Sequence, residues 1–149
     1  MARVDFYHLT RDSAEAALAM LAGKALGAGQ RMMVVSADPA QRSAISRRLW
    51  EAPGFLANGE AGGEDDARQP VLIGDAPGAA NAAANGAGIV ALADGQWRDE
   101  ALDFDRALLL FNEATIADAR SCWRALGQQE KVERHYWSQD SSGRWREGP

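Results

Sequence analysis

Apolar and polar positions along the chain predict short strands alternating with helices. Residues 3–9 alternate apolar and polar side chains, which is typical of a strand. Short apolar runs follow at residues 32–35, 71–73, 89–92 and 107–111. Runs of this length predict strands that are buried on both faces of a sheet.

Three segments show helical spacing. The first begins after a capping Asp12 or Ser13 and ends at two glycines. The second starts with a proline at residue 39 and must end before the next proline at residue 53. The third covers residues 115–126, where Ile116, Ala119, Cys122, Trp123 and Leu126 share one face.

Other stretches lack such periodicity. Residues 52–69 predict a long loop rich in Gly, Ala, Glu and Asp, and the low-complexity residues 76–88 predict a surface excursion. Residues 132–137 and 144–145 predict extended segments around a Ser-Ser-Gly turn. The order of elements predicts an α/β fold in one domain over residues 1–149, with a mostly parallel central sheet flanked by helices.

The composition is that of an ordinary globular protein, with 46% hydrophobic and 25% charged residues. The only cysteine, Cys122, permits no internal disulfide, and we expect a buried, unreactive thiol. The amino terminus lacks the pattern of a secretory signal, and no run of about 18 apolar residues could span a membrane. These features predict a cytoplasmic protein.

Charge is unevenly distributed. The net charge of −5 argues against a protein whose main role is to bind nucleic-acid phosphates. Residues 1–119 hold 10 basic and 17 acidic side chains, whereas residues 120–149 hold 6 basic and 4 acidic ones. A basic end on an acidic body favours a local acidic partner. The alternative is that ordinary scatter of surface charges produces the same uneven distribution.

Catalytic motifs are missing from the sequence. Residues 10–13, after the first strand, contain no glycine, so the nucleotide-binding glycine loop is absent, and there is no P-loop motif. His8, His135 and Cys122 lack the spacing of a zinc site, so we expect no metal or cofactor. Asp75 follows a strand and is the best placed carboxylate for an alternative, a small nucleotide- or anion-binding enzyme.

The carboxyl-terminal third combines aromatic and basic side chains. Arg120 and Arg124 are stacked one helical turn apart, just past the Trp123 edge of the apolar face. Arginine and aromatic residues are enriched at interface hot spots, and this arrangement suits a short acidic peptide with an apolar end. Two alternatives stay open: Trp123 could be plain core rimmed by arginines, or the cluster could bind single-stranded DNA directly.

The sequence resembles the chi subunits of bacterial DNA polymerase III holoenzyme, and the alphaproteobacterial type in particular. The resemblance covers nearly the whole chain in order, and it is carried by FYHLT at residues 6–10, LW at 49–50, FL at 55–56, AR with WR at 119–124, YWSQD at 136–140 and GRW at 143–145. It implies a Rossmann-like α/β domain and a non-catalytic accessory subunit.

The resemblance also implies two binding surfaces. Arg120, Trp123 and Arg124 match the family positions that bind the C-terminal tail of single-stranded-DNA-binding protein. Trp50 and Phe55 match positions of a surface for psi, a clamp-loader subunit, or for a repair helicase, although Trp50 could be plain core. One basic position of some relatives falls on Gly127, which implies a less cationic tail pocket, and Ala57-Asn58 replaces their Pro-His.

Overall fold

The computed structural model describes residues 2–77 and 84–148. Within these ranges the strands are β1 (Ala2–His8), β2 (Met32–Val35), β3 (Asn58–Glu60), β4 (Val71–Gly74), β5 (Ile89–Leu92), β6 (Arg106–Phe111), β7 (Val132–Gln139) and β8 (Trp145–Glu147). The α-helices are α1 (Ala14–Gly27), α2 (Pro39–Glu51) and α3 (Ile116–Leu126), and short 3-10 turns occur at η1 (Asp66–Arg68) and η3 (Asp99–Asp103).

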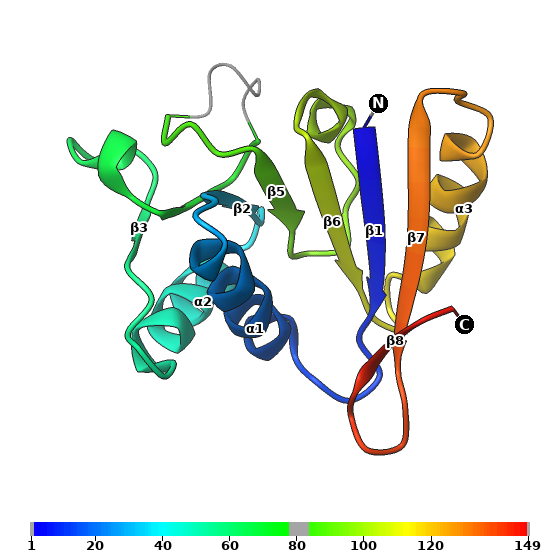
Figure 1. Cartoon of the computed structure of the whole chain (residues 1–149), viewed down its shortest axis with the longest axis horizontal. Coiled ribbons are helices and arrows are strands. Elements are labelled where there is room, and N and C mark those ends of the chain that lie inside the picture. Colours follow the sequence, from blue (N-terminus) through cyan, green and yellow to red (C-terminus); the bar gives the residue numbers. More distant parts are fainter. Residues whose placement is uncertain (1, 78–83, 149) are drawn as a thin grey trace.

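The strands form one sheet in the order β3-β4-β2-β5-β6-β1-β7-β8 (Figure 1). All neighbouring strands run parallel except the antiparallel pair β7 and β8. The predicted α/β class with a mostly parallel sheet is therefore confirmed.

Helices cover the two faces of the sheet unequally. The core on one face joins α1 and α2 to the apolar side chains of β2, β4, β5 and β6. The core on the other face joins α3 and η3 to the opposite side chains of the same sheet. Successive side chains of a strand point to opposite faces, so Val4 and Phe6 of β1 pack toward α3, while Tyr7 packs on the α1 side.

Local sequence explains where the helices begin. Ser13 caps α1, because its Oγ accepts a hydrogen bond from the Ala16 amide at 3.1 Å. Asp38 caps α2 in the same way through the Ala40 amide at 3.0 Å, and Pro39 occupies the first turn. Both helices begin at the predicted positions. Of the two candidate caps for α1, Asp12 and Ser13, the structure has Ser13.

The prediction of a continuous loop over residues 52–69 is wrong. Strand β3 lies inside this stretch and pairs with β4, in the register Asn58 to Val71. The Asn-Gly-Glu sequence of β3 has no strand pattern of its own. Its backbone is held by the buried Asn58 side chain, which accepts a hydrogen bond from Ser46 Oγ of α2 at 2.6 Å and donates one to Leu56 O at 2.9 Å.

The surface excursion predicted for residues 76–88 lies partly outside the described residues. At its carboxyl-terminal end the prediction is wrong, because Asn85 and Ala87 are buried. The Asn85 side chain donates hydrogen bonds to the carbonyls of Met32 and Gln69, at 3.2 and 3.0 Å. A polar side chain with these partners can be buried without an apolar stripe in the sequence.

Candidate functional site

A pocket of about 330 Å³ opens between α3 and the strands beneath it. We call it the α3 pocket, and it is lined by Phe6, Phe111, Ala119, Arg120, Trp123, Arg124 and Tyr136. The structure thus brings together the three predicted residues Arg120, Trp123 and Arg124. It adds aromatic walls from β1, β6 and β7.

The arginines of the α3 pocket are exposed and not neutralised. Among the described residues, no carboxylate lies within ion-pair distance of Arg120 or Arg124. Arg124 makes only a long hydrogen bond of 3.4 Å to Ser121 Oγ. Burial raises the pKa of the Tyr136 phenol, and the charge of Arg120 opposes that rise. The pocket therefore pairs free cationic donors with an apolar, neutral floor.

Trp123 is a wall of the α3 pocket rather than a fully buried core residue. Its relative exposure is intermediate, whereas Ala119, Cys122 and Leu126 of the same helix are buried. The indole meets Phe6 edge to face, with ring centroids 5.1 Å apart, and meets Tyr136 in the same way at 5.9 Å. The Arg134 guanidinium lies over the ring, 4.2 Å from its centroid. Such packing fixes the ring while leaving part of it open.

Cys122 lies on the buried side of α3. Burial raises the pKa of its thiol to about 12, with a smaller contribution from Asp99. A thiol of this kind is a poor nucleophile, in agreement with the predicted inert role. His8 stacks on Phe111 and contacts both Tyr136 Oη at 3.2 Å and Glu113 Oε1 at 3.0 Å.

Two large aromatic side chains are exposed near the end of α2. Trp50 is 48% exposed and Phe55 is 74% exposed, so the alternative that Trp50 is plain core is wrong. Phe55 also has a positive φ of 52°, and Gly54 before it has a φ of 88°. An exposed aromatic residue in this left-handed conformation is unusual, and such outliers are more frequent at functional sites.

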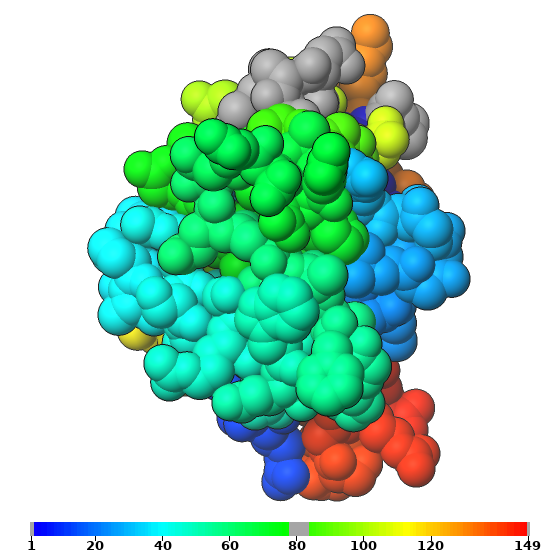
Figure 2. Space-filling model, turned by 90° about the vertical axis from the view of Figure 1, so that its left-hand side faces the viewer, coloured from blue at the N-terminus to red at the C-terminus, as the bar shows by residue number. Residues whose placement is uncertain are grey.

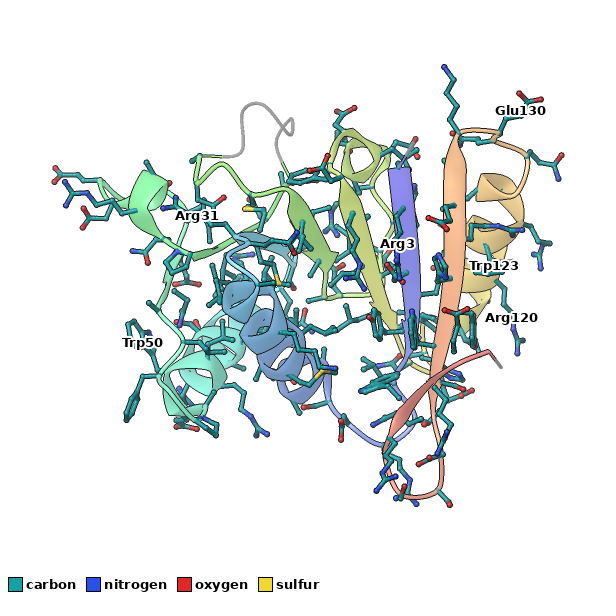
Figure 3. All side chains as sticks on the ribbon, in the orientation of Figure 1. Arg3, Arg31, Trp50, Arg120, Trp123 and Glu130 are labelled. Atoms are coloured by element: carbon teal, nitrogen blue, oxygen red, sulfur yellow. The ribbon has the colours of Figure 1, made fainter. Side chains whose placement is uncertain are left out.

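Trp50 lies far from the α3 pocket. In Figure 3 Trp50 lies on the opposite side of the molecule from Arg120 and Trp123. Figure 2 faces the side formed by α2, in cyan, and by the segment after it, in green. The two predicted surfaces therefore lie on different sides of the molecule.

A second arginine group surrounds the buried carboxylate of Asp5, on the α1 side of the sheet. We call Arg3, Asp5, Arg106 and Trp137 the Asp5 cluster. Arg106 Nε donates to Asp5 Oδ2 at 2.7 Å, Arg3 donates to both carboxylate oxygens at 3.0 Å, and Trp137 Nε1 donates to Oδ1 at 2.9 Å. Burial alone would raise the pKa of Asp5, but hydrogen bonds from Arg3, Trp137 and Arg106 lower it below its ordinary value.

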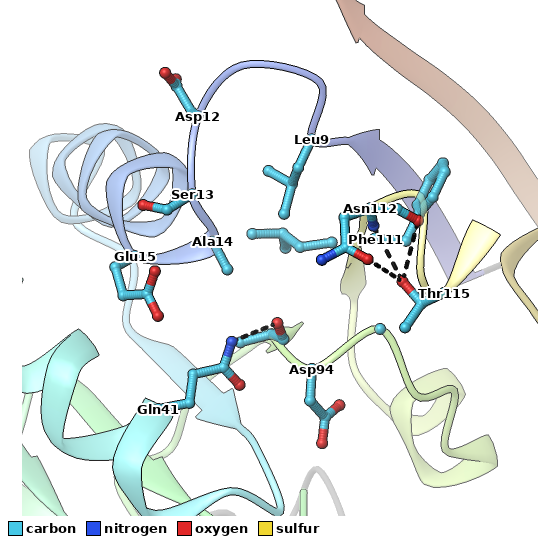
Figure 4. A pocket seen from close by; sticks show the side chains of 13 residues that line it. Leu9, Asp12, Ser13, Ala14, Glu15, Gln41, Asp94, Phe111, Asn112 and Thr115 are labelled. Atoms are coloured by element: carbon cyan, nitrogen blue, oxygen red, sulfur yellow. Dashed lines mark hydrogen bonds between the residues drawn. The ribbon is translucent and has the colours of Figure 1, made fainter.

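Another pocket, of about 280 Å³, lies where the central strands end (Figure 4). Parallel α/β sheets often bind ligands at such a place. Asp12, Glu15 and Asp94 are among its lining residues, and these carboxylates would repel a phosphate. Asp75, the candidate of the enzyme hypothesis, is exposed and does not line it. The geometry gives no support to an anion site here.

Within residues 2–77 and 84–148, no group of three or more His, Cys, Asp or Glu side chains could hold a metal ion. In the same part of the chain, no helix is both long and apolar enough to cross a membrane.

The fold and the α3 pocket define an α/β protein with a mostly parallel sheet and a pocket lined by arginine and aromatic side chains. The chain belongs to the DNA polymerase III chi subunit family (HolC), whose model matches residues 1–132. It is also 38% identical over 77 residues to the DNA polymerase III subunit chi of Pseudomonas aeruginosa. That match covers 50% of this chain and 54% of the length of the relative.

Proposed function

We propose that this chain is a non-catalytic accessory subunit of DNA polymerase III in DNA replication. In this role it links the clamp loader, through psi, to the C-terminal tail of single-stranded-DNA-binding protein. The observation that carries the proposal is the α3 pocket, where Arg120 and Arg124 have no carboxylate partner among the described residues and stand beside Trp123 and Tyr136. Family membership supports the same role.

The tail would bind through two kinds of contact. Its carboxylates would accept hydrogen bonds from Arg120 and Arg124, which are charge-assisted and therefore stronger than neutral ones. Its apolar terminal residue would lie against the aromatic walls of the pocket. A peptide site of this size should be weak, with a Kd of roughly 1 μM, or about −8 kcal/mol. Many tails on coated DNA would raise the local concentration and retain the polymerase.

The exposed aromatic residues at the end of α2 would bind psi or a repair helicase. Trp50 and Phe55 are the large hydrophobic side chains that stand out from the described surface. Exposed aromatic residues of this kind are frequent anchors of protein–protein interfaces. The position of Trp50 opposite the α3 pocket supports a linker that holds two partners at once (Figure 3).

Isothermal titration calorimetry with a peptide of the tail of the organism's own single-stranded-DNA-binding protein tests the first surface. The wild type should bind with a Kd of roughly 1 μM, and Arg120→Ala should lose most of this affinity. Arg47→Ala, an exposed arginine on α2, is the matched control and should bind like the wild type. No binding by the wild type would remove the linker mechanism.

Two variants test the second surface. Trp50→Ala and Phe55→Ala should reduce capture of purified psi or helicase, and they should leave affinity for the tail peptide unchanged. A variant that lost both activities would indicate misfolding rather than two surfaces, and circular dichroism would detect this. Full capture by both variants would overturn the assignment of Trp50 and Phe55.

Direct binding of single-stranded DNA is the alternative that the α3 pocket favours, because arginine and aromatic side chains also stack and neutralise nucleotides. Titration with a labelled oligonucleotide in the absence of protein partners distinguishes it. Binding that is tighter than peptide binding and is lost in Arg120→Ala would favour this alternative. A thermal-shift screen against nucleotides tests the enzyme hypothesis in the same way, since a bound ligand stabilises the folded state.

A further inference from the structure

Arg134 contacts Trp123 without lining the α3 pocket. It lies on β7, and its Cζ atom is 4.2 Å from the centroid of the indole. Its Nη1 also donates a hydrogen bond of 2.7 Å to the carbonyl oxygen of Trp123. Since Arg134 is not among the residues that line the pocket, it acts on a ligand only through the ring it covers.

Gly127 supplies the space that this arginine occupies. Its φ of −64° and ψ of −17° are ordinary helical values that any residue adopts, so the backbone does not require glycine here. A Cβ at this position would lie 2.9 Å from Nη1 and 3.0 Å from Cζ of Arg134. A side chain at residue 127 would therefore displace the guanidinium from its place over Trp123.

The remaining contacts of the ring show what the guanidinium contributes. Phe6 and Tyr136 hold Trp123 through edge-to-face contacts, at centroid distances of 5.1 and 5.9 Å. Arg134 covers a face of the ring, and its hydrogen bond ties β7 to the last turn of α3. A cation at a helix carboxyl terminus is also favourable. Without Arg134, that face of the indole would lose this contact, and the ring would be less restrained.

We propose that Arg134 is a positioning residue for the α3 pocket, and that Gly127 is required because it makes room for the Arg134 guanidinium. Arg134 holds the Trp123 indole in the orientation that walls the pocket, which lowers the ordering cost of peptide binding. The inference rests on the proposed function, since it concerns affinity for the same peptide.

The deciding variant is Gly127→Ala, compared with Gly27→Ala. Gly27 ends α1, and a Cβ there would meet nothing within 4 Å, so it controls for the glycine-to-alanine change at a helix end. Gly127→Ala should remain folded and bind the tail peptide about two- to fivefold more weakly, as expected for loss of a cation–π contact. Gly27→Ala should bind like the wild type.

Arg134 variants separate positioning from charge. Arg134→Ala should weaken binding at least as much as Gly127→Ala, and the double variant should be no weaker than Arg134→Ala alone. Arg134→Lys keeps the charge but loses the planar contact, and it should be intermediate. Lys131→Ala removes a nearby exposed charge without touching Trp123 and should have little effect. Wild-type affinity in Gly127→Ala, or full additivity in the double variant, would overturn the proposal.

A measurement without peptide keeps the two proposals apart. The indole N–H signal of Trp123, assigned by its loss in Trp123→Phe, reports the order of the ring through ¹⁵N relaxation. Gly127→Ala should lower the order parameter of this signal, and Gly27→Ala should not. If the wild type bound no peptide, the linker function would fail, while unchanged order in Gly127→Ala would independently refute the positioning role of Arg134.

Discussion

Arginines are paired differently on the two faces of this sheet. In the Asp5 cluster, Arg3 and Arg106 converge on a carboxylate whose side chain is 0% exposed. In the α3 pocket, Arg120 and Arg124 have no carboxylate partner among the described residues and face solvent. Guanidinium groups that are already paired contribute to stability, whereas unpaired ones remain available for a ligand. The same residue type is structural on one face and suited to recognition on the other.

The pocket beside the Asp5 cluster makes the contrast sharper. It has a volume of about 390 Å³ and is lined by Arg3, Arg106, Trp137 and Trp145 among others, so its composition resembles that of the α3 pocket. Its two arginines are nevertheless committed to Asp5. Composition alone would rank the two pockets as equals, and only the hydrogen-bond partners distinguish them.

Removing the Asp5 carboxylate should have the largest effect on stability. Asp5→Ala would leave Arg3, Arg106 and the Trp137 N–H without their shared partner, and we expect a loss of about 2–3 kcal/mol in the free energy of unfolding, since the two arginines stay partly solvated. Urea denaturation followed by circular dichroism measures it. Arg120→Ala is the control and should change stability by no more than about 0.5 kcal/mol. A loss below about 1 kcal/mol in Asp5→Ala would show that the cluster is not structural.

Replacing one arginine of each kind with alanine should separate effects on stability from effects on binding. Arg124→Ala should weaken binding of the tail peptide by about 1.5–3 kcal/mol, the range for hydrogen bonds to charged groups, and leave stability unchanged. Arg3→Ala should lower stability by about 1 kcal/mol, because its side chain is 39% exposed and the pair is partly screened, and leave peptide affinity unchanged. Calorimetric titration and urea denaturation of both variants give the four values. Equal effects of both substitutions on affinity would contradict the assignment.

The stabilisation by Asp5 should also depend on pH. Its pKa is lower in the folded protein, so its contribution is present above the ordinary pKa of about 3.9 and is lost as the pH falls through the lowered folded value. The difference in unfolding free energy between the wild type and Asp5→Asn should therefore be largest near neutral pH and shrink in acid. Asp75→Asn, at an exposed aspartate, is the control. If this difference in unfolding free energy stayed constant from neutral pH down to acid, the lowered pKa of Asp5 in the folded protein would be contradicted.

Local pattern was sufficient to predict the part of the α3 pocket that lies on one helix. Arg120, Trp123 and Arg124 lie within two helical turns, so helical spacing alone places them together. The aromatic walls could not be found in this way, because Phe6, Phe111 and Tyr136 come from three strands that pair only in the folded sheet. The contact of Arg134 with Gly127 also depends on the packing of β7 against α3.

Other features departed from the pattern for physical reasons. Asp5 occupies a polar position of an alternating strand, which predicts exposure, yet three donors satisfy it and allow complete burial. Strand β3 has no apolar residue, and it forms because an edge of β4 offers backbone partners. The exposure and positive φ of Phe55 depend on how α2 ends, which no periodicity encodes.

The smallest expected effect is that of salt, and it distinguishes the two groups of arginines once more. Raising salt from about 0.1 M to about 1 M shortens the Debye length from about 10 Å to about 3 Å, which screens exposed charges but hardly affects buried pairs. Peptide binding at the α3 pocket should therefore weaken severalfold, and less so in a variant lacking Arg120 and Arg124. The stability difference between the wild type and Asp5→Ala should change less over the same range, because the Asp5 carboxylate is buried although its arginine partners are partly exposed. Affinity that did not respond to salt would mean that the aromatic walls, rather than the exposed arginines, dominate recognition of the tail.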